Sequence, residues 1–553
     1  MSHLTSVFSL STVQAIIFGL VVGLVTYWWL QKRRFKLPPG PFAFPIVGNI
    51  MQMSSKYHED FFEWSKRYGP VLTVHLGHIR TVVVHDIKSV NEVLMTRGVE
   101  FADRISTHSI DIFSSGGRDI IFGQYGATWR LHRKISSKAL RRYMQGEELE
   151  KRVHTAVDMV TELFIKEVEP FDPKWHLSSV LFNILCAICF GTSYELDDPK
   201  MQKAMKALDH LSSVNSSFLF LEDFIPPLRK CPMGKYKKFL QLVNDLIHDF
   251  VGKEFYRHVE SYHPENLRDF TDLLIQTRKV VEDEDDESVL ESLTDDHLIH
   301  SLNDIFFAGV DTTRATLRWV FLYLAAYPDM QEKIQNEVDG VVGRDRLPRL
   351  CDRPNLPYTE AFLYEAMRLS TVAPIGVPHK AVCDTKIGEY DVPKGTMVII
   401  NQWALHHDPK NWEDVHKFKP DRYLTIDGRL GPKPDHWLPF SAGPRVCLGE
   451  SVAKPELHLL LASLMQRFIV RLPEGVQADF APLNGTNYDV LFYVSFQRCY
   501  CTSLLIRACR MPSHLLLATE KTNQATSRTV CLAYRGKHFA NFSKFSRRFL
   551  CMV

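Results

Sequence analysis

Runs of apolar residues along the chain predict an N-terminal membrane segment followed by a body that is mainly helical. Residues 13–30 are almost continuously apolar, and the basic residues 32–34 follow at once. This length suits a bilayer span, and the positive cluster should remain in the cytosol. A cleaved signal peptide is the weaker alternative, because the start lacks a basic region and no small-residue cleavage site precedes the charges. We therefore expect residues 1–34 to be a membrane anchor.

Beyond the anchor, two short stretches have the pattern of strands and most of the rest has helical periodicity. Residues 71–76 and 81–85 are rich in Val, Leu and Thr, and Gly77 between them predicts a turn. The longest helical pattern begins after Thr294, which can cap it, and ends before Pro328. At 1.5 Å per residue this helix would be about 50 Å long. The predicted fold class is mainly α with a small β part.

One loop, residues 440–449, combines glycines, a proline and a cysteine before an apolar helical run. The thiolate of Cys447 could bind a metal ion, and the glycines let the backbone turn without a Cβ clash. Arg445 can make charge-assisted hydrogen bonds to an anionic group. The alternative is an ordinary buried cysteine, since free cysteine is among the most buried residue types.

The long predicted helix carries a polar interruption, residues 308–313. Gly309, Asp311 and Thr312 are poor choices for a buried helix interior. A local kink without chemistry would explain them. In the functional interpretation, Gly309 leaves room for a small ligand, Thr312 offers a hydroxyl group and Asp311 relays protons.

Composition and charge limit the class of partner and the location that the sequence can indicate. The 553 residues have a net charge of +2, but ten Lys or Arg and one acidic residue lie after position 495. Nothing in the main body indicates nucleic-acid binding. The eleven cysteines show no paired framework, and Cys186 and Cys189 sit in an apolar run typical of packing residues. A reducing, cytosol-facing location fits this usage.

The loop 440–449 resembles the haem-binding loop of cytochrome P450s, with Phe440, Gly443, Arg445, Cys447 and Gly449 in place. The resemblance extends over about residues 35–496 and implies the cytochrome P450 fold for this catalytic domain. It also implies haem b with Cys447 as the axial thiolate ligand of iron, and NADPH electrons delivered by NADPH–cytochrome P450 reductase.

The same resemblance assigns roles to further residues. Asp311 and Thr312 would supply protons for oxygen activation. Candidate partners of the haem propionates are Arg104, Trp129, Arg133, His379 and Arg445, although His379 could equally be a hydrogen-bonded turn histidine. A structural network beneath the haem would join Glu365, Arg368 and Arg422.

Within the family the chain is most similar to the microsomal steroid 17-alpha-hydroxylase/17,20-lyases, through stretches such as 372–381 and 403–408. This implies an endoplasmic reticulum membrane enzyme that hydroxylates carbon 17 of pregnane-type steroids, with weak side-chain cleavage. The implied substrate-facing positions are Phe122, Asn215, Ala308, Val372, Ala373, Val377 and Val490. Residues 346–358 instead resemble xenobiotic-oxidising P450s, so oxidation of xenobiotics or fatty acids is the alternative. A haem protein that only binds ligands or rearranges peroxides is a third possibility.

The expected partners are a reductase, a small apolar substrate and a membrane, and cytochrome b5 is a further candidate. Cations crowd residues 130–142, which suits docking of an acidic electron-transfer partner, or equally a solvated helix face. In the resembled enzyme, cytochrome b5 docks on two arginines. Here Arg353 keeps one and Tyr364 replaces the other. Pro455 predicts a helix kink, and residues 497–553 are expected to be a basic C-terminal extension.

Overall fold

The computed structural model of the chain describes residues 15, 18, 19, 23, 35–215, 220–230, 232–482, 490 and 492–498. The predicted anchor and the predicted extension therefore lie outside the described residues, apart from a few positions. Among the helices that the structure describes, none is both long enough and apolar enough to cross a membrane. Contacts divide the chain into Met1–Gln497 and Arg498–Val553, and the first unit is described below.

The β part consists of one five-stranded sheet and two strand pairs. The sheet has the order β1–β2–β7–β4–β3, in which β2 and β7 are parallel and the other neighbours antiparallel. Its strands are β1 (Val71–Leu76), β2 (Ile79–Val84), β3 (Asp103–Arg104), β4 (His379–Lys380) and β7 (Met397–Ile400). The pairs join β5 (Thr385–Ile387) to β6 (Tyr390–Val392), and β8 (Phe468–Arg471) to β9 (Ser495–Arg498). Both predicted strands are confirmed, the second beginning two residues earlier.

Helices form most of the remaining described chain, as predicted. Those that precede the longest helix are α2 (Tyr57–Tyr68), α3 (Ile87–Asn91), α4 (His108–Phe113), α5 (Ala127–Tyr143), α6 (Gly146–Lys166), α7 (Lys174–Cys189), α8 (Pro199–Asn215), α9 (Leu221–Phe224), α10 (Gly234–Val243), α11 (Lys253–Ser261), α12 (Phe270–Asp283) and α13 (Glu287–Leu290). The others are α14 (Asp295–Ala326), α15 (Pro328–Val341), α16 (Pro357–Ser370), α17 (Gln402–His407) and α18 (Glu450–Arg467).

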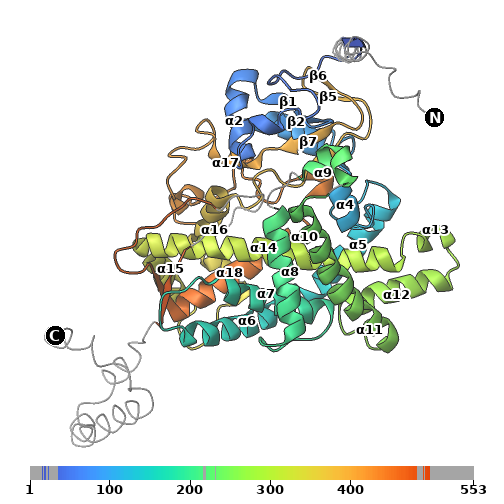
Figure 1. Cartoon of the computed structure of the whole chain (residues 1–553). Helices are drawn as coiled ribbons and strands as arrows, with labels where there is room; N and C mark the ends of the chain where they lie inside the picture. Colours follow the sequence, from blue (N-terminus) through green and yellow to red (C-terminus); the bar gives the residue numbers. More distant parts are fainter. Residues whose placement is uncertain are drawn as a thin grey trace, which may run out of the picture. The chain divides into compact units, whose positions relative to one another are not determined.

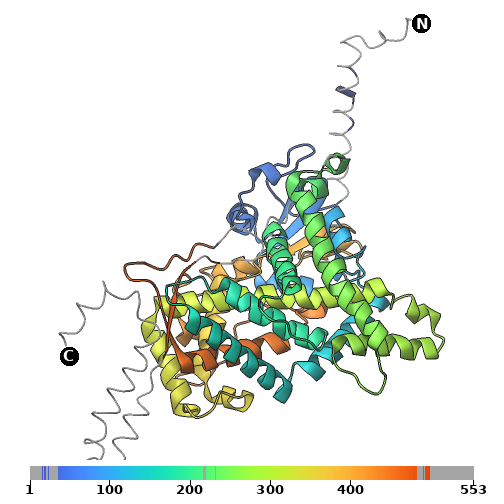
Figure 2. The ribbon, with the colours of Figure 1, turned by 60° about the horizontal axis from the view of Figure 1, so that its bottom comes forward.

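The helix α14 crosses the helical body, and α7, α8, α16 and α18 pack against it (Figure 1). It is still seen running through the body after the rotation of Figure 2. Its 32 residues confirm the predicted long helix, with Thr294 at the N-cap and Pro328 opening the next helix. The Thr294 hydroxyl, however, bonds the His297 ring at 2.8 Å and caps no amide.

Two local predictions have different outcomes. Cys186 and Cys189 are fully buried on α7, which confirms that they are packing residues. Pro455 lies inside α18, which is assigned as one helix from Glu450 to Arg467, and the kink expected there stays a prediction. Because Pro455 lies in the second turn, it removes only one intrahelical hydrogen bond, to Ser451, near the start of the helix.

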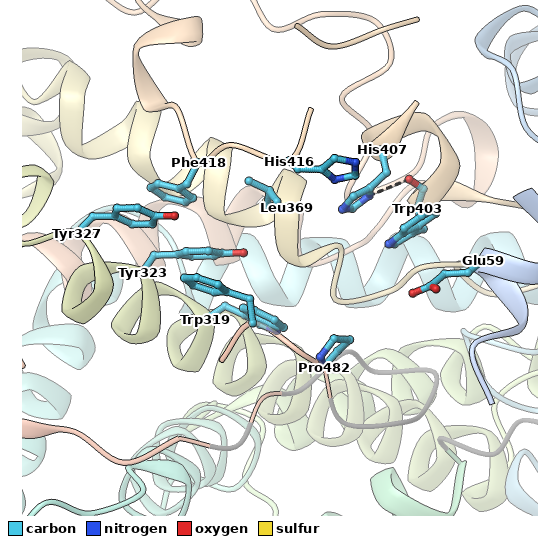
Figure 3. A pocket seen from close by; sticks show the side chains of 11 residues that line it. Glu59, Trp319, Tyr323, Tyr327, Leu369, Trp403, His407, His416, Phe418 and Pro482 are labelled. Carbon is cyan, nitrogen blue, oxygen red and sulfur yellow. Dashed lines mark hydrogen bonds between the residues drawn. The ribbon is translucent and has the colours of Figure 1, made fainter. Parts of the chain in front are cut away.

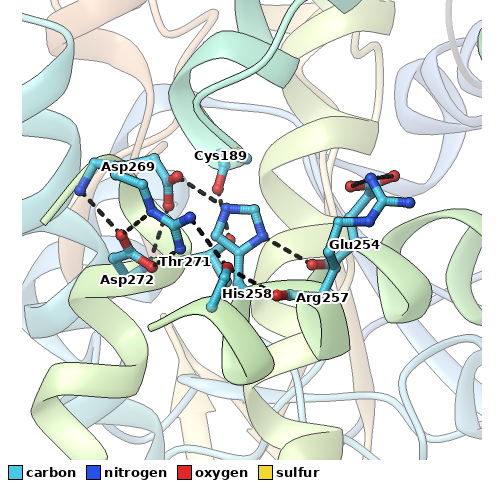
Figure 4. A network of polar contacts seen from close by, with 9 residues as sticks. Cys189, Glu254, Arg257, His258, Asp269, Thr271 and Asp272 are labelled. Carbon is cyan, nitrogen blue, oxygen red and sulfur yellow. Dashed lines mark hydrogen bonds and ion pairs between the residues drawn. The ribbon is translucent and has the colours of Figure 1, made fainter. Parts of the chain in front are cut away.

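A buried polar network fastens α11 to α12 (Figure 4). His258 Nε2 lies 2.9 Å from Asp269 Oδ2, and Asp269 Oδ1 accepts from the Asp272 amide at 3.0 Å. Arg268 donates to both oxygens of Asp272, at 2.7 and 2.8 Å. Every carboxylate oxygen of Asp269 and Asp272 has a donor. The network therefore holds α11 and the start of α12 together. Burial lowers the pKa of His258, but Asp269 outweighs it and raises that pKa overall.

Candidate functional site

A cavity of about 370 Å³ lies between α14, the segment that follows α16 and the cysteine loop. Its walls are mainly apolar side chains, including Leu181 and Leu185 of α7. The cavity brings together most of the residues predicted for the site, although they come from distant parts of the chain. Those that line it are Arg104, Arg133, Ala308, Thr312, Val372, Ala373, Val377, His379, Arg445 and Cys447.

The cysteine loop owes its shape to a close backbone contact. Gly443 has φ +72°, and a Cβ there would lie 1.9 Å from the Leu94 carbonyl oxygen. Only glycine fits such a position. The loop then makes a short turn, and the Cys447 amide donates to the Phe440 carbonyl at 2.9 Å. Gly449, by contrast, has an ordinary negative φ.

The Cys447 side chain lines the cavity and is exposed there. Burial raises the pKa of the thiol, whereas the amides of Gly449 and Glu450 and the charge of Arg133 act in the opposite direction. These donors would stabilise a thiolate once a cation bound it, because each favours the charged sulfur. The loop is therefore built to hold a thiolate ligand of a metal ion.

Three guanidinium groups gather at the cavity wall. Arg104 donates to the carbonyls of Ile121 (3.1 Å) and Val377 (2.6 Å), and Arg133 to Val446 (2.5 Å). Arg445 donates to the carbonyls of Ala102 (2.7 Å), Ile120 (3.3 Å) and Gly123 (2.5 Å). Within the described part of the chain, none of the three arginines forms an ion pair with a carboxylate.

Burial lowers the pKa of each of these arginines, well below its usual value for Arg104 and to about 10 for Arg445. Uncompensated buried cations are costly, and an anionic ligand would relieve that cost. A flat apolar group with two carboxylates and a metal centre fits this wall together with the Cys447 thiol. Haem b, the cofactor that the resemblance implies, has this chemistry.

Trp129 and His379 were both predicted as partners of the cofactor, and each already has a hydrogen-bond partner in the protein. Trp129 does not line the cavity, and its one N–H donates to the Ile120 carbonyl at 2.9 Å. Its ring instead lies under Arg445, 4.0 Å from the guanidinium carbon, so Trp129 supports the arginine through a cation–π contact. His379 lines the cavity with its Nδ1 on the Phe101 carbonyl at 2.9 Å. Because a carbonyl accepts, Nδ1 carries the proton, and only an imidazolium could donate to an anion from Nε2.

The polar interruption of α14 separates into two faces. Thr312 faces the cavity, and its hydroxyl donates to the Ala308 carbonyl at 2.7 Å. Gly309 also lines the cavity, where a Cβ would meet Leu185 Cδ1 at 2.9 Å. Asp311 does not line it. Its carboxylate is buried and ion-paired with Arg314 on the same helix.

Arg314 connects Asp311 to the surface. It donates to Asp209 Oδ1 on α8 at 2.9 Å, and Lys174 of α7 lies 2.7 Å from the same oxygen. Burial raises the pKa of Asp209, but Arg314 and Lys174 outweigh it and lower that pKa overall. Asp311 therefore begins a chain of charges that ends at the half-exposed pair of Asp209 and Lys174. The side chain of Asp311 is therefore not among those that line the cavity.

The predicted network of Glu365, Arg368 and Arg422 is assembled in the structure. Arg368 donates to both oxygens of Glu365, at 2.8 and 2.9 Å, and Arg422 Nε to one of them at 3.1 Å. Arg368 also holds the His406 carbonyl at 2.8 Å, while the His406 ring accepts from the Leu438 amide at 3.1 Å. Since residue 438 leads into the cysteine loop, the network supports that loop. His406 was missed by sequence reasoning, although it lies within the quoted stretch 403–408.

The remaining predicted substrate positions divide into three cases. Phe122 packs edge-to-face on Phe113 with ring centroids 6.1 Å apart, and it is not among the lining residues. Val490 is fully buried in the main core cluster and does not line the cavity either. The side chain of Asn215 lies outside the described residues.

Sequence reasoning also missed a buried acidic pair beside the cavity. Asp304 on α14 lines it and accepts hydrogen bonds from the amides of Ile120 (2.7 Å) and Ile121 (2.9 Å). Asp119, in the segment before α5, lies against Asp304. Nearly two hundred residues separate the two aspartates, so no local pattern could have revealed their contact.

A second hollow of about 190 Å³ lies among aromatic rings (Figure 3). Tyr323 stacks on Phe418 with centroids 4.2 Å apart, and Trp403 stacks on His407 at 4.3 Å. The described residues that line it include no cysteine and no arginine. We therefore assign the functional site to the larger cavity.

The positions considered for partner docking differ in exposure. Arg130, Lys134 and Lys138 are exposed on α5, whereas Arg133 of the same helix turns toward Cys447. Tyr364 is only 7% exposed, and its ring packs on Trp437 with centroids 4.8 Å apart. The expectation that position 364 is a surface docking residue is therefore wrong.

Comparisons with known proteins agree on one family. The family described as Cytochrome P450 matches residues 38–486. The steroid 17-alpha-hydroxylase/17,20 lyase of Ictalurus punctatus is 36% identical over 80% of this chain and 86% of that protein. The enzyme of the same name from Gallus gallus is 36% identical over 78% of this chain and 86% of its own. Cytochrome P450 1A1 of Rattus norvegicus is 33% identical over 86% of this chain and 92% of that protein.

Proposed function

The chain belongs to the cytochrome P450 family and is a cytochrome P450 monooxygenase, and from this premise we propose that it hydroxylates carbon 17 of a pregnane-type steroid. The observation that carries the steroid assignment is the identity of 36% to two steroid 17-alpha-hydroxylase/17,20 lyases over more than three quarters of the chain. The apolar cavity between Ala308, Val372 and Val377 supports it, because a steroid offers mostly apolar surface.

The arginine cluster and the cysteine loop would hold the cofactor. Cys447 would provide the thiolate ligand, and Arg104, Arg133 and Arg445 would bind the two propionates with N–H groups that face the cavity. Haem iron with a thiolate ligand supplies the chemistry that inserts one atom of O2 into a C–H bond. The family takes electrons for this reaction from a reductase.

The protein's own contribution to the reaction is positioning and proton supply. Thr312 would turn its hydroxyl from the Ala308 carbonyl toward the reaction site and donate a hydrogen bond there. Asp311 would act indirectly, since the Arg314–Asp209 chain links it to the protein surface. The apolar walls exclude bulk water, so a proton reaches the site only through such polar groups.

Contact with an electron donor is proposed for the exposed cations of α5. Arg130, Lys134, Lys138, Arg141 and Arg142 lie on the helix whose Arg133 reaches toward Cys447. A positive surface steers an acidic partner and speeds its association. NADPH–cytochrome P450 reductase is the proposed partner, with cytochrome b5 as a second acidic candidate.

Membrane association is supported by exposed apolar side chains near the start of the described body. Phe42, Ile46 and Met51 are 67%, 78% and 78% exposed. Large apolar groups left in water near a predicted anchor are typical of a membrane-facing surface. We propose an endoplasmic reticulum location with the catalytic domain on the cytosolic side.

A second candidate function is oxidation of planar xenobiotics, which the identity of 33% to cytochrome P450 1A1 favours. The experiment that separates the candidates titrates the purified holoenzyme with progesterone and with a polycyclic arene, following the Soret band. We expect the steroid to shift the band at lower concentration and to yield a 17-hydroxylated product. Tight binding and turnover of the arene without any steroid product would favour the second candidate.

A further inference from the structure

The cavity wall formed by the segment before α5 depends on a pair of buried carboxyl groups. Asp304 is 3% exposed, and its Oδ2 accepts from the amides of Ile120 and Ile121. Asp119 is also 3% exposed, and its Oδ1 accepts from the Phe122 amide at 2.9 Å. Together the two carboxyls hold three consecutive amides of the segment 120–122.

The second oxygen of each carboxyl has no such donor. Asp304 Oδ1 and Asp119 Oδ2 are buried, and neither has a hydrogen-bond partner among the donors that the structure describes. The two side chains lie within hydrogen-bond reach of each other. Two adjacent buried carboxylates repel strongly, so one of them must carry a proton. That proton would satisfy both orphaned oxygens in a single hydrogen bond.

We propose that Asp119 and Asp304 share one proton and thereby act as a pH-sensitive latch that fastens the cavity wall 119–123 to α14. The pair touches neither Cys447 nor Thr312, so both aspartates are positioning residues. They affect the site through the backbone carbonyls of this segment. The Ile120, Ile121 and Gly123 carbonyls of this segment hold Arg445 and Arg104, and Ile120 also holds Trp129.

The charges around the pair decide the range in which it titrates. Arg445 from the cysteine loop and Arg104 from β3 face Asp119, while Arg133 of α5 and His379 of β4 adjoin these two arginines. The cations favour ionisation, but burial outweighs them and raises the pKa of Asp119 to about 7. Burial and Asp119 together raise the pKa of Asp304 well above its usual value.

The consequence follows from the sign of these shifts. A group with a raised folded-state pKa stabilises the folded arrangement at low pH, and this stabilisation disappears as pH rises through the folded pKa. As pH rises through about 7, Asp119 loses its proton and the pair keeps a single shared proton, because the charge of Asp119 raises the pKa of Asp304 further. At higher pH the second ionisation places two negative charges in contact, and the wall segment should separate from α14 more often.

Hydrogen exchange of the Ile120 and Ile121 amides in the holoenzyme tests this latch. The wild type is compared with Asp119→Asn at each pH, so that intrinsic exchange chemistry cancels. The asparagine amide donates to Asp304 at every pH, which replaces the shared proton by a permanent one. We expect equal protection near pH 6, and at higher pH, once the pair loses its second proton, a loss of wild-type protection relative to the variant of up to about tenfold per pH unit.

Two further variants keep the test decisive. Asp304→Asn can accept from the two amides and donate to Asp119, so it should also remove the pH dependence. Asp103→Asn is the matched control, because Asp103 accepts from the Tyr125 amide at 2.8 Å and pairs with Lys380 at 3.5 Å. It should keep the wild-type profile. A protection ratio between wild type and Asp119→Asn that stays constant from pH 6 to pH 9 would overturn the proposal.

An infrared difference spectrum provides a second readout that does not depend on exchange. Wild type minus Asp119→Asn should contain the carbonyl band of a protonated carboxylic acid near pH 6, and this band should fade over the pH range in which the amide protection is lost. Its absence near pH 6 would mean that no proton is shared, and would refute the latch even if both proteins bind the cofactor equally.

Discussion

Replacing Glu365 by glutamine should strongly destabilise the folded protein, because one carboxylate serves the buried guanidinium of Arg368 and the partly buried guanidinium of Arg422. Glu365 and Arg368 are fully buried, and they form a bidentate pair at 2.8 and 2.9 Å. Arg422 depends on the same carboxylate at 3.1 Å. Removing one member of a buried ion pair costs about 3–5 kcal/mol, since the remaining charge is left uncompensated. This is a large part of the 5–15 kcal/mol typical of whole domains.

The assay is urea unfolding of the holoenzyme followed by circular dichroism. Arg422→Met is the matched control, because it removes one hydrogen bond to Glu365 and one to the Glu413 carbonyl and leaves the Glu365–Arg368 pair intact. We expect it to cost about 1.5–3 kcal/mol, clearly less than Glu365→Gln. Equal losses, or a loss below about 1 kcal/mol for Glu365→Gln, would refute the reasoning that the carboxylate is the shared centre of the network.

Three more outcomes are expected. Thr312→Ala should lower product formed per NADPH by about tenfold or more and release peroxide, whereas Thr312→Ser should retain coupling; unchanged coupling in the alanine variant would exclude a proton-donating role. Asp269 raises the pKa of His258, so their contact stabilises the folded protein fully below about pH 6.5. This stabilisation is lost as pH rises through the higher folded-state pKa. The melting temperature of His258→Gln should therefore lack this decline with pH. Tyr364→Arg should destabilise the fold by about 3 kcal/mol or more, measured in urea, because it buries a guanidinium beside Trp437; a stable variant with stronger cytochrome b5 binding would show that position 364 reaches the surface.

Local spacing predicted the parts of the site that a single segment specifies. The turn at Gly443, the long helix up to Pro328 and the three-residue spacing of Glu365 and Arg368 all depend on near neighbours. The structure adds a reason for Gly443, which is the close approach of the Leu94 carbonyl.

Helix phase explains why Asp311 does not line the cavity. The lining residues of α14 recur as the neighbouring pairs 304–305, 308–309 and 312–313, and Asp311 falls outside these pairs. Arg314, three residues after Asp311, was readable from the sequence as an ion-pair partner.

Long-range contacts account for the rest. No sequence pattern indicates that the Trp129 indole would meet the Ile120 carbonyl, or that Asp119 would lie against Asp304. These contacts depend on how the segment before α5 packs on α14, which is a property of the assembled fold and not of local periodicity.

The central claim is tested most directly by supplying the holoenzyme, a reductase and NADPH with progesterone under oxygen-18 gas and analysing the products by mass spectrometry. The account predicts a 17-hydroxylated steroid that has gained one labelled oxygen atom, and no such product from Cys447→Ser. An active, thiolate-ligated haem protein that consumes NADPH but leaves every pregnane steroid unoxidised would contradict it.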